Sequence, residues 1–145
     1  MSALHYLHQR LIVHMDIKPE NIMIQREANV AKIIDFGVSQ IVEYPTMPMK
    51  VALAGTYRYM PPEQHNEKVT LKSDIWSFAC VLFELCTGIK PFHGINEYAL
   101  CYKIALGVNP LEYALENEPA WKLKVIRENE DLKDLLTQCF SQSQS

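Results

Sequence analysis

The sequence predicts a mainly α-helical domain that carries one small β-hairpin. Apolar side chains recur every three to four residues at residues 1–9 and 131–140, which is the spacing of one helix face. Residues 74–85 are apolar nearly all round, as expected of a helix buried at the centre of a domain. Two short apolar runs, residues 22–24 and 30–34, flank a turn-forming segment and predict the hairpin.

The first half of the chain alternates between short apolar segments and polar loops. Residues 11–13 predict a short strand or loop entry, and residues 14–21 form a polar loop that leads into the hairpin. The stretch 38–59 is expected to be irregular, because Pro45 and Pro48 break any helix. An irregular stretch of that length usually has a function.

The positions of proline, glycine and capping residues delimit the next helices. Pro61 can begin a short helix, since proline suits the first helical turn. Thr70 or Ser73 can cap the central helix, and the pair Thr87 and Gly88 can end it.

The C-terminal third predicts two further helices. Residues 96–106 and 131–140 are helical, whereas the acidic stretch 111–118 is compatible with either helix or loop. The low-complexity residues 141–145 are expected to be a disordered polar tail. The folded domain is therefore predicted to span residues 1–140.

Composition and charge exclude several classes of function. The chain has 145 residues, a formal net charge of −3 and no basic block, so we expect no nucleic-acid partner. The longest apolar stretch, residues 75–86, is too short to span a bilayer, and no signal peptide follows Met1. The four cysteines form no C-x-x-C pair and are expected to be free thiols in a reducing compartment, the cytoplasm or the nucleus.

Two polar segments lie directly beside apolar runs. The first, residues 14–21, reads H-x-D-x-K-P-E-N, and the second, residues 35–37, reads D-F-G. Taken singly, Asp16 is most often a turn residue, His14 a packed core residue and Lys18 a solvated amine. The two patterns together, at this spacing, are rarely met by chance and indicate one site.

The chain resembles the eukaryotic protein kinases, serine/threonine type, over four ordered motifs. Residues 14–21 look like the catalytic loop, and residues 35–37 look like the metal-binding D-F-G segment. Residues 55–63 are similar to the end of the activation segment, and residues 73–77 to the start of the central helix. The resemblance implies the large, C-terminal lobe of a kinase domain, with ATP and Mg²⁺ as cofactors and a protein Ser/Thr hydroxyl as substrate.

The same resemblance implies separate roles for the site residues. Asp16 would accept the proton of the substrate hydroxyl, Lys18 would steady the moving phosphoryl group, and Thr56 would contact both. Asn21 and Asp35 would hold Mg²⁺ through hard oxygen ligands. The residues that the resemblance implies for ATP binding are Lys18, Glu20, Asn21, Met23 and Asp35.

Some of these residues have a plainer interpretation. Met23 would be the apolar floor beneath the adenine ring, although a strand-core residue has the same character. His14 and Phe36 would stack in a regulatory column held from below by Asp74, for which helix capping is the alternative. A metal-dependent hydrolase that uses Asp16, His14 and Asp35 would leave the K-P-E-N and D-x-W-S segments unexplained.

The sequence also departs from the kinase pattern. Met15 replaces the usual arginine and cannot pair with a phosphorylated loop, so we expect weaker dependence on loop phosphorylation. Pro61 replaces the alanine of A-P-E, and Glu63 has no arginine in the expected later position. The glycine-rich loop, the small-lobe lysine and the final helix are not found in the sequence.

These departures leave two hypotheses. In the first, the chain is a fragment of a serine/threonine kinase, with its catalytic residues intact but inactive alone. In the second, it is a non-catalytic binding module of the pseudokinase type. Both predict an exposed apolar face around Met23 and Ile24, which a small lobe or partner protein would cover.

Overall fold

The computed structural model describes residues 2–45 and 47–141. The helices are α1 (Ser2–His8), α2 (Pro62–His65), α3 (Leu71–Thr87), α4 (Glu97–Ala105), α5 (Pro110–Asn117), α6 (Lys124–Arg127) and α7 (Glu130–Ser141). The strands are β1 (Ile12–Val13), β2 (Ile22–Gln25), β3 (Val30–Ile33), β4 (Gln40–Ile41), β5 (Met49–Lys50) and β6 (Lys68–Val69). Three short 3-10 helices complete the described elements: η1 (Pro19–Asn21), η2 (Tyr57–Tyr59) and η3 (Ala120–Leu123). The prediction of a mainly helical domain with a small hairpin is confirmed.

Three antiparallel strand pairs organise the N-terminal half. The predicted hairpin is β2–β3, in which Ile22 pairs with Ile33 and Met23 with Lys32. The pairs β1–β4 and β5–β6 were not predicted. They correct the expectation that residues 38–59 are wholly irregular, because β4 and β5 fasten this segment at two points. The rest of that segment holds the 3-10 helix η2.

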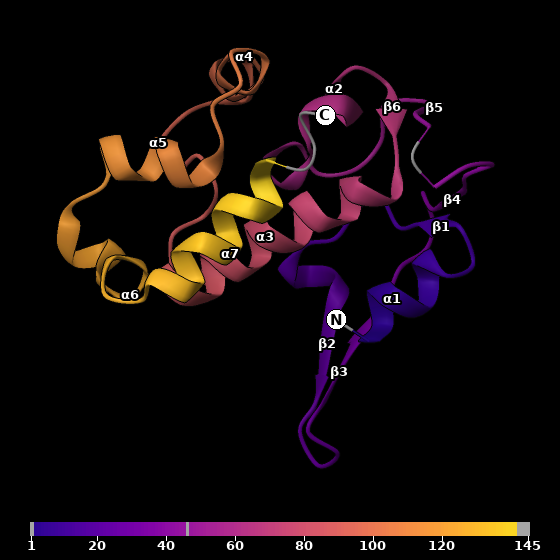
Figure 1. Ribbon diagram of the computed structural model, residues 1–145, viewed down its shortest axis with the longest axis horizontal. Coiled ribbons are helices and arrows are strands. Elements are labelled where there is room, and N and C mark those ends of the chain that lie inside the picture. The colour runs from indigo at the N-terminus through magenta and orange to yellow at the C-terminus, as the bar shows by residue number, and fades with distance from the viewer. Residues whose placement is uncertain (1, 46, 142–145) are drawn as a thin grey trace.

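Helix α3 lies at the centre of the fold, with α7 beside it (Figure 1). Its N-cap is Thr70, whose hydroxyl accepts the backbone N–H of Lys72, while the side chain of Ser73 caps the backbone of Thr70 in return. The helix ends at Thr87, and Gly88 caps it in the left-handed conformation with φ 69°. Glycine adopts this conformation at little energetic cost because it has no Cβ. Thr70 is therefore the cap, and the alternative that Ser73 is the N-cap is wrong.

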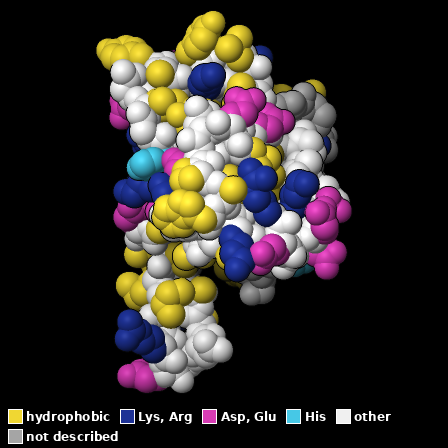
Figure 2. All heavy atoms as spheres, turned by 90° about the vertical axis from the view of Figure 1, so that its left-hand side faces the viewer, with side chains coloured by type: hydrophobic (Ala, Val, Ile, Leu, Met, Phe, Trp, Pro, Cys, Tyr) yellow, Lys and Arg dark blue, Asp and Glu magenta, His cyan; other side chains and the backbone are white. Residues whose placement is uncertain are grey.

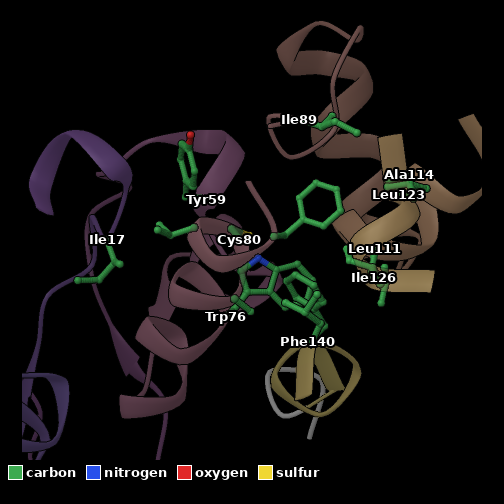
Figure 3. Close-up of a cluster of buried hydrophobic side chains, with 14 of the residues drawn as sticks. Ile17, Tyr59, Trp76, Cys80, Ile89, Leu111, Ala114, Leu123, Ile126 and Phe140 are labelled. Carbon is green, nitrogen blue, oxygen red and sulfur yellow. The ribbon is translucent and has the colours of Figure 1, made fainter. Parts of the chain in front are cut away.

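The main hydrophobic core forms around α3 (Figure 3). The rings of Trp76 and Phe140 meet edge to face with centroids 4.9 Å apart, which joins α3 to α7. Both side chains are fully buried, as is Phe83 on the same helix. Burial of one such side chain contributes about 1.5–3 kcal/mol, so this contact fixes the last helix to the domain.

Two smaller clusters flank this core. One contains Val13, Met15, Val42 and Val69, which brings β1, the loop after it, β4 and β6 together. The other surrounds α4 and α5 and contains Phe92, Leu100, Ile104 and Tyr113. The first cluster places the loop 14–21 against the segment 38–59.

The C-terminal third differs from its prediction at three points. The ambiguous stretch 111–118 is mostly helical, because Asn109 and Glu112 form a capping box in front of α5. The 3-10 helix η3 and helix α6 were not predicted. Ser141, assigned to the polar tail, is the last residue of α7, and residues 142–145 lie outside the described residues.

The β2–β3 hairpin projects from the helical part of the molecule (Figures 1 and 2). Met23 and Ile24 are exposed there by 54% and 61%, as predicted. Over residues 2–45 and 47–141, no helix has the length and apolar character that crossing a bilayer requires.

Candidate active site

The loop 14–21 is anchored to the central helix through one buried carboxylate. Asp74, fully buried in the first turn of α3, accepts the backbone N–H of His14 at 2.9 Å and of Met15 at 3.0 Å. Its Oδ2 also lies 2.9 Å from Nε2 of His8 in α1. These contacts hold Met15 at φ 68°, a left-handed conformation that is rare for a long side chain. Asp74 is thus an anchor for the loop, and the helix-capping alternative is wrong.

His14 is a structural residue of this loop. Its Nε2 lies 3.0 Å from the carbonyl of Ile34, and its Nδ1 accepts the backbone N–H of Asp16 at 3.3 Å. The fully buried ring meets Phe36 edge to face at 5.0 Å, as predicted. Since both ring nitrogens bond to the backbone, His14 is unavailable as a general base, which argues against the hydrolase alternative.

Asp16 is the centre of a polar network. Its Oδ1 accepts the hydroxyl of Thr56 at 2.8 Å, and its Oδ2 lies 2.8 Å from Lys18 Nζ. Lys18 Nζ also donates to Thr56 Oγ1 at 2.8 Å, which closes a three-membered network. The side chains of Asp16 and Lys18 are 13% and 22% exposed, so both are ordered by the protein while a face of each remains accessible. The predicted contact of Thr56 with both residues is confirmed.

Asn21 completes the network from the 3-10 helix η1. Its Nδ2 donates to the backbone oxygen of Asp16 at 2.8 Å and to Asp16 Oδ2 at 3.1 Å. Because the amide nitrogen is used twice, the amide oxygen is the group left for a ligand. Pro19 occupies the first position of η1. The fixed φ of proline suits the start of a helical turn.

Asp35 lies at the other edge of the site, two residues beyond the end of strand β3. The backbone N–H of Ile34 donates to the carbonyl of Asn21 at 2.9 Å, so the segment leaving β3 runs beside η1. Asp35 is exposed, has φ 62°, and accepts the N–H of Gly37 at 3.2 Å. A carboxylate and an amide oxygen are hard ligands that fit Mg²⁺. Within the described ranges no group of three or more His, Cys, Asp or Glu side chains is arranged to hold a metal ion by itself.

The other two predicted ATP-binding residues form no side-chain hydrogen bond with this network in the described part of the chain. Met23 is exposed on β2, opposite Lys32. Glu20 is exposed, and its negative charge is one of the causes that raise the pKa of the buried Tyr59 hydroxyl. The largest cause is burial, followed by the hydrogen bond from Tyr59 to Glu84 at 2.6 Å.

Sequence reasoning missed Gln64, which locks the loop to the activation segment. This fully buried side chain donates to the carbonyls of Met15 at 2.9 Å and Ala54 at 2.7 Å. A Cβ on neighbouring Gly55, at φ 110°, would lie 2.7 Å from the Met15 oxygen, so only glycine fits. No periodicity marks Gln64, since its partners are backbone atoms remote in sequence.

Arg58 was also missed as an anchor. Its guanidinium donates to the carbonyls of Pro91, Phe92 and Ile95, at 2.6–3.0 Å. These bonds tie η2, which follows Thr56 directly, to the loop before α4. These bonds therefore help to hold Thr56, the residue before η2, in place.

Glu63 is left with an incomplete set of partners. Its Oε1 accepts the hydroxyl of Ser73 at 2.8 Å, whereas its buried Oε2 has no hydrogen-bond partner within the described chain. Burial raises the pKa of this carboxyl; its own backbone N–H, Ser73 and the charge of Lys72 oppose the rise. Among the described residues, the side-chain hydrogen bond to this carboxylate comes from Ser73.

Comparison with known proteins agrees with this geometry. A family model described as a protein kinase domain matches residues 1–145, and the chain belongs to this family. It is 42% identical over 106 residues to the probable serine/threonine-protein kinase PknB of Bifidobacterium longum, covering 71% of the chain. It is 37% identical over 106 residues to human 3-phosphoinositide-dependent protein kinase 1, covering 72% of the chain. It is 38% identical over 124 residues to the serine/threonine-protein kinase ppk21 of Schizosaccharomyces pombe, covering 79% of the chain. The matched regions make up 15%, 19% and 21% of these three relatives.

Proposed function

We propose that this domain contributes the catalytic half of a protein serine/threonine kinase, which transfers the γ-phosphoryl group of ATP to Ser and Thr hydroxyls. The observation that carries the proposal is the closed network of Asp16, Lys18 and Thr56, joined by Asn21. Such a transfer needs positioned charges more than covalent chemistry. A carboxylate beside an ammonium group, each held by two partners, supplies them.

Each residue of the network has a distinct task. Asp16, oriented by Thr56 and Asn21, accepts the proton of the substrate hydroxyl. Lys18 shares its ammonium between Asp16 and Thr56, and can stabilise charge on the transferred phosphoryl group. When bound, Mg²⁺ would neutralise charge on the ATP phosphates, and Asn21 and Asp35 are the residues that would hold it. Met23 offers an apolar surface to the adenine ring.

Two features favour serine and threonine over tyrosine as substrates. Lysine at position 18 and threonine at position 56 are those of the serine/threonine class, and their hydrogen bond restricts the space beside Asp16. The relatives named above are also described as serine/threonine kinases or as a phosphoinositide-dependent kinase.

An apolar face beside the site supports the need for a covering lobe or partner. A groove of about 440 Å³ lies between α1 and β3, with Tyr6, Val30 and Phe36 among its lining residues. These side chains are exposed, as are Met23 and Ile24 on the hairpin. We therefore expect the 145-residue chain alone to have negligible phosphotransfer activity. Its four cysteines are free in the structure, which suits a reducing compartment, the cytoplasm or the nucleus.

The alternative, a non-catalytic binding module, would use the same surface without chemistry. It has no need for the hydrogen bonds that orient Asp16. Binding would then be the same with Asn in place of Asp16, whereas phosphotransfer would not.

Phosphate transfer from radiolabelled ATP to serine, threonine and tyrosine peptides tests the proposal. Two samples are compared: the 145-residue chain alone, and the product of the longest reading frame that contains it. We expect the longer product to label the serine and threonine peptides, and Asp16→Asn to lower its kcat at least about 100-fold. Asp131→Asn, an exposed change in α7, is the matched control. Equal labelling by the Asp16→Asn variant, or none by the unmutated product, would favour the binding module.

A further inference from the structure

Helices α2 and α4 bring a cysteine and a histidine together outside the proposed active site. Cys101 lies in the middle of α4, and its Sγ is 3.7 Å from Nδ1 of His65, the last residue of α2. Cys101 is a partly exposed residue at the edge of the cluster formed by α4 and α5. Its thiol is therefore near the surface and has an imidazole as hydrogen-bond partner.

Burial of the His65 imidazole favours its neutral form, which can accept a proton. Burial lowers the pKa of His65 below its ordinary value of 6.5, and the backbone of Tyr57 and Met60 opposes this only in part. His65 is therefore neutral at pH 7, and its Nδ1 can accept the hydrogen of the Cys101 thiol. The Tyr57 ring packs against the imidazole with centroids 5.8 Å apart and limits its rotation.

The surroundings of His65 contain few titratable groups. Tyr57 from η2 and Cys101 from α4 are those in contact with it, and no charged side chain contributes to its pKa shift. The behaviour of the pair thus depends on the histidine and the thiol themselves.

We propose that Cys101 is a site of reversible oxidation by hydroperoxides, for which His65 is the base. The thiol proton passes to His65 Nδ1 as the sulfur attacks one peroxide oxygen. A sulfur–oxygen bond forms, the oxygen–oxygen bond breaks, and the departing oxygen takes the proton from His65 to leave as water or an alcohol. The sulfur is oxidised to sulfenic acid and the peroxide is reduced, so no further reactant is needed.

The other three cysteines lack this combination and provide internal controls. Cys80 is fully buried, and burial raises the pKa of its thiol. Burial also raises the pKa of Cys139. Cys86 is partly exposed like Cys101, but it has no histidine contact in the described part of the chain. It is therefore the matched reference.

The pH dependence of the reaction separates the pair from an ordinary thiol. A thiol with a pKa of about 8.5 is about 1% thiolate at pH 6.5, and its rate rises about tenfold per pH unit below that pKa. With a neutral imidazole as base, the rate at Cys101 stays nearly level from pH 6.5 to 8. It falls only when His65 becomes protonated.

The test is made on the full chain with hydrogen peroxide from pH 5.5 to 9. Sulfenic acid is trapped with dimedone, and each cysteine is quantified by peptide mass spectrometry. We expect Cys101 to be labelled about tenfold or more faster than Cys86 at pH 6.5, with a flatter pH profile. His65→Asn should remove this advantage and leave Cys86 unchanged.

Two results would overturn the proposal. One is a Cys101 rate that runs parallel to that of Cys86 across the pH range in the unmutated protein, a comparison that needs no variant to fold. The other is an unchanged Cys101 rate in a His65→Asn variant whose circular dichroism matches the unmutated chain.

Discussion

At the scale of single residues, Gln64 connects two segments that must keep a fixed distance. Its one amide nitrogen donates to the carbonyls of Met15 in the loop 14–21 and Ala54 in the segment 38–59. The strained backbone of Met15 depends on such bonds, because its positive φ is unfavourable by itself. A side chain without a hydrogen-bond donor at position 64 would leave the carbonyls of Met15 and Ala54 without the Gln64 hydrogen bond.

Gln64→Leu should therefore lower the free energy of unfolding by about 1–3 kcal/mol. We expect a value of about 1 kcal/mol, because Gln64 Oε1 is itself buried without a partner. Removing this oxygen in the leucine variant offsets part of the loss of stability. Urea denaturation followed by tryptophan fluorescence measures the change. Gln138→Leu, on the exposed side of α7, should change stability by less than about 0.5 kcal/mol. Equal effects of the two variants would show that the Gln64 bonds contribute little.

Glu63 makes stability depend on pH in a direction unusual for a carboxylate. Since burial raises its pKa, the folded protein favours the protonated form. The stability that protonated Glu63 contributes is fully present below the pKa of the unfolded state, about 4.5. It is lost as the pH rises through the raised pKa of the folded state.

We expect Glu63→Gln to stabilise the chain at pH 7, with the gain vanishing towards pH 4. The amide keeps an oxygen for the Ser73 hydroxyl and removes the buried charge. Urea midpoints of both proteins from pH 4 to 8 give the difference. Glu116→Gln, an exposed control on α5, should show no such trend. A gain that is independent of pH would assign the effect to something other than ionisation.

The network around Asp16 was predictable because its residues are recorded in short motifs. Residues 14–21 fix Asp16, Lys18 and Asn21 within one loop, and the motif around Thr56 adds the fourth member. Gln64, Arg58 and His8 have the same structural importance but no such signal. Their partners are backbone carbonyls or a carboxylate at least 10 residues away, a relation that only the fold creates.

At the scale of elements, the β2–β3 hairpin carries exposed apolar side chains beside the proposed site. Its register places Met23 opposite Lys32 and Ile24 opposite Ala31. Hydrophobic side chains on a projecting hairpin favour self-association when nothing covers them.

Ile24→Lys should therefore reduce self-association of the isolated chain. Light scattering coupled to size-exclusion chromatography at several concentrations measures the monomer fraction, which should rise in this variant. Ile41→Lys is the control, because Ile41 is 72% exposed on β4, in a different strand pair. If both variants raise the monomer fraction equally, the added charge alone is responsible.

Long elements with a clear period were predictable, whereas several short ones were not. Helices α3 and α7 show a sustained apolar pattern, and the hairpin shows two apolar runs around a turn. The pairs β1–β4 and β5–β6 are two residues long in each strand, so no period can develop. They form because the cluster of Val13, Met15, Val42 and Val69 draws distant segments together.

At the scale of the whole molecule, α3 belongs to both the hydrophobic core and the proposed active site. Its Trp76 and Phe83 side chains are fully buried in the core, while Asp74, two residues before Trp76, holds the loop 14–21. The fully buried Asp74 has little freedom to move without its helix. The loop is therefore coupled to the most stable part of the domain.

This coupling has a consequence for the rate at which backbone amides exchange with deuterium. The amides of His14 and Met15 can exchange only when they leave Asp74, so their opening should require the same unfolding event that exposes the amides of α3. We expect protection close to that of Trp76 and Cys80, and far above that of the hairpin turn at residues 26–29. Asp74→Asn should bring the loop amides down to turn-like exchange before α3 is affected. The loop would then open on a timescale of its own, whereas in the unmutated chain it opens only with the core.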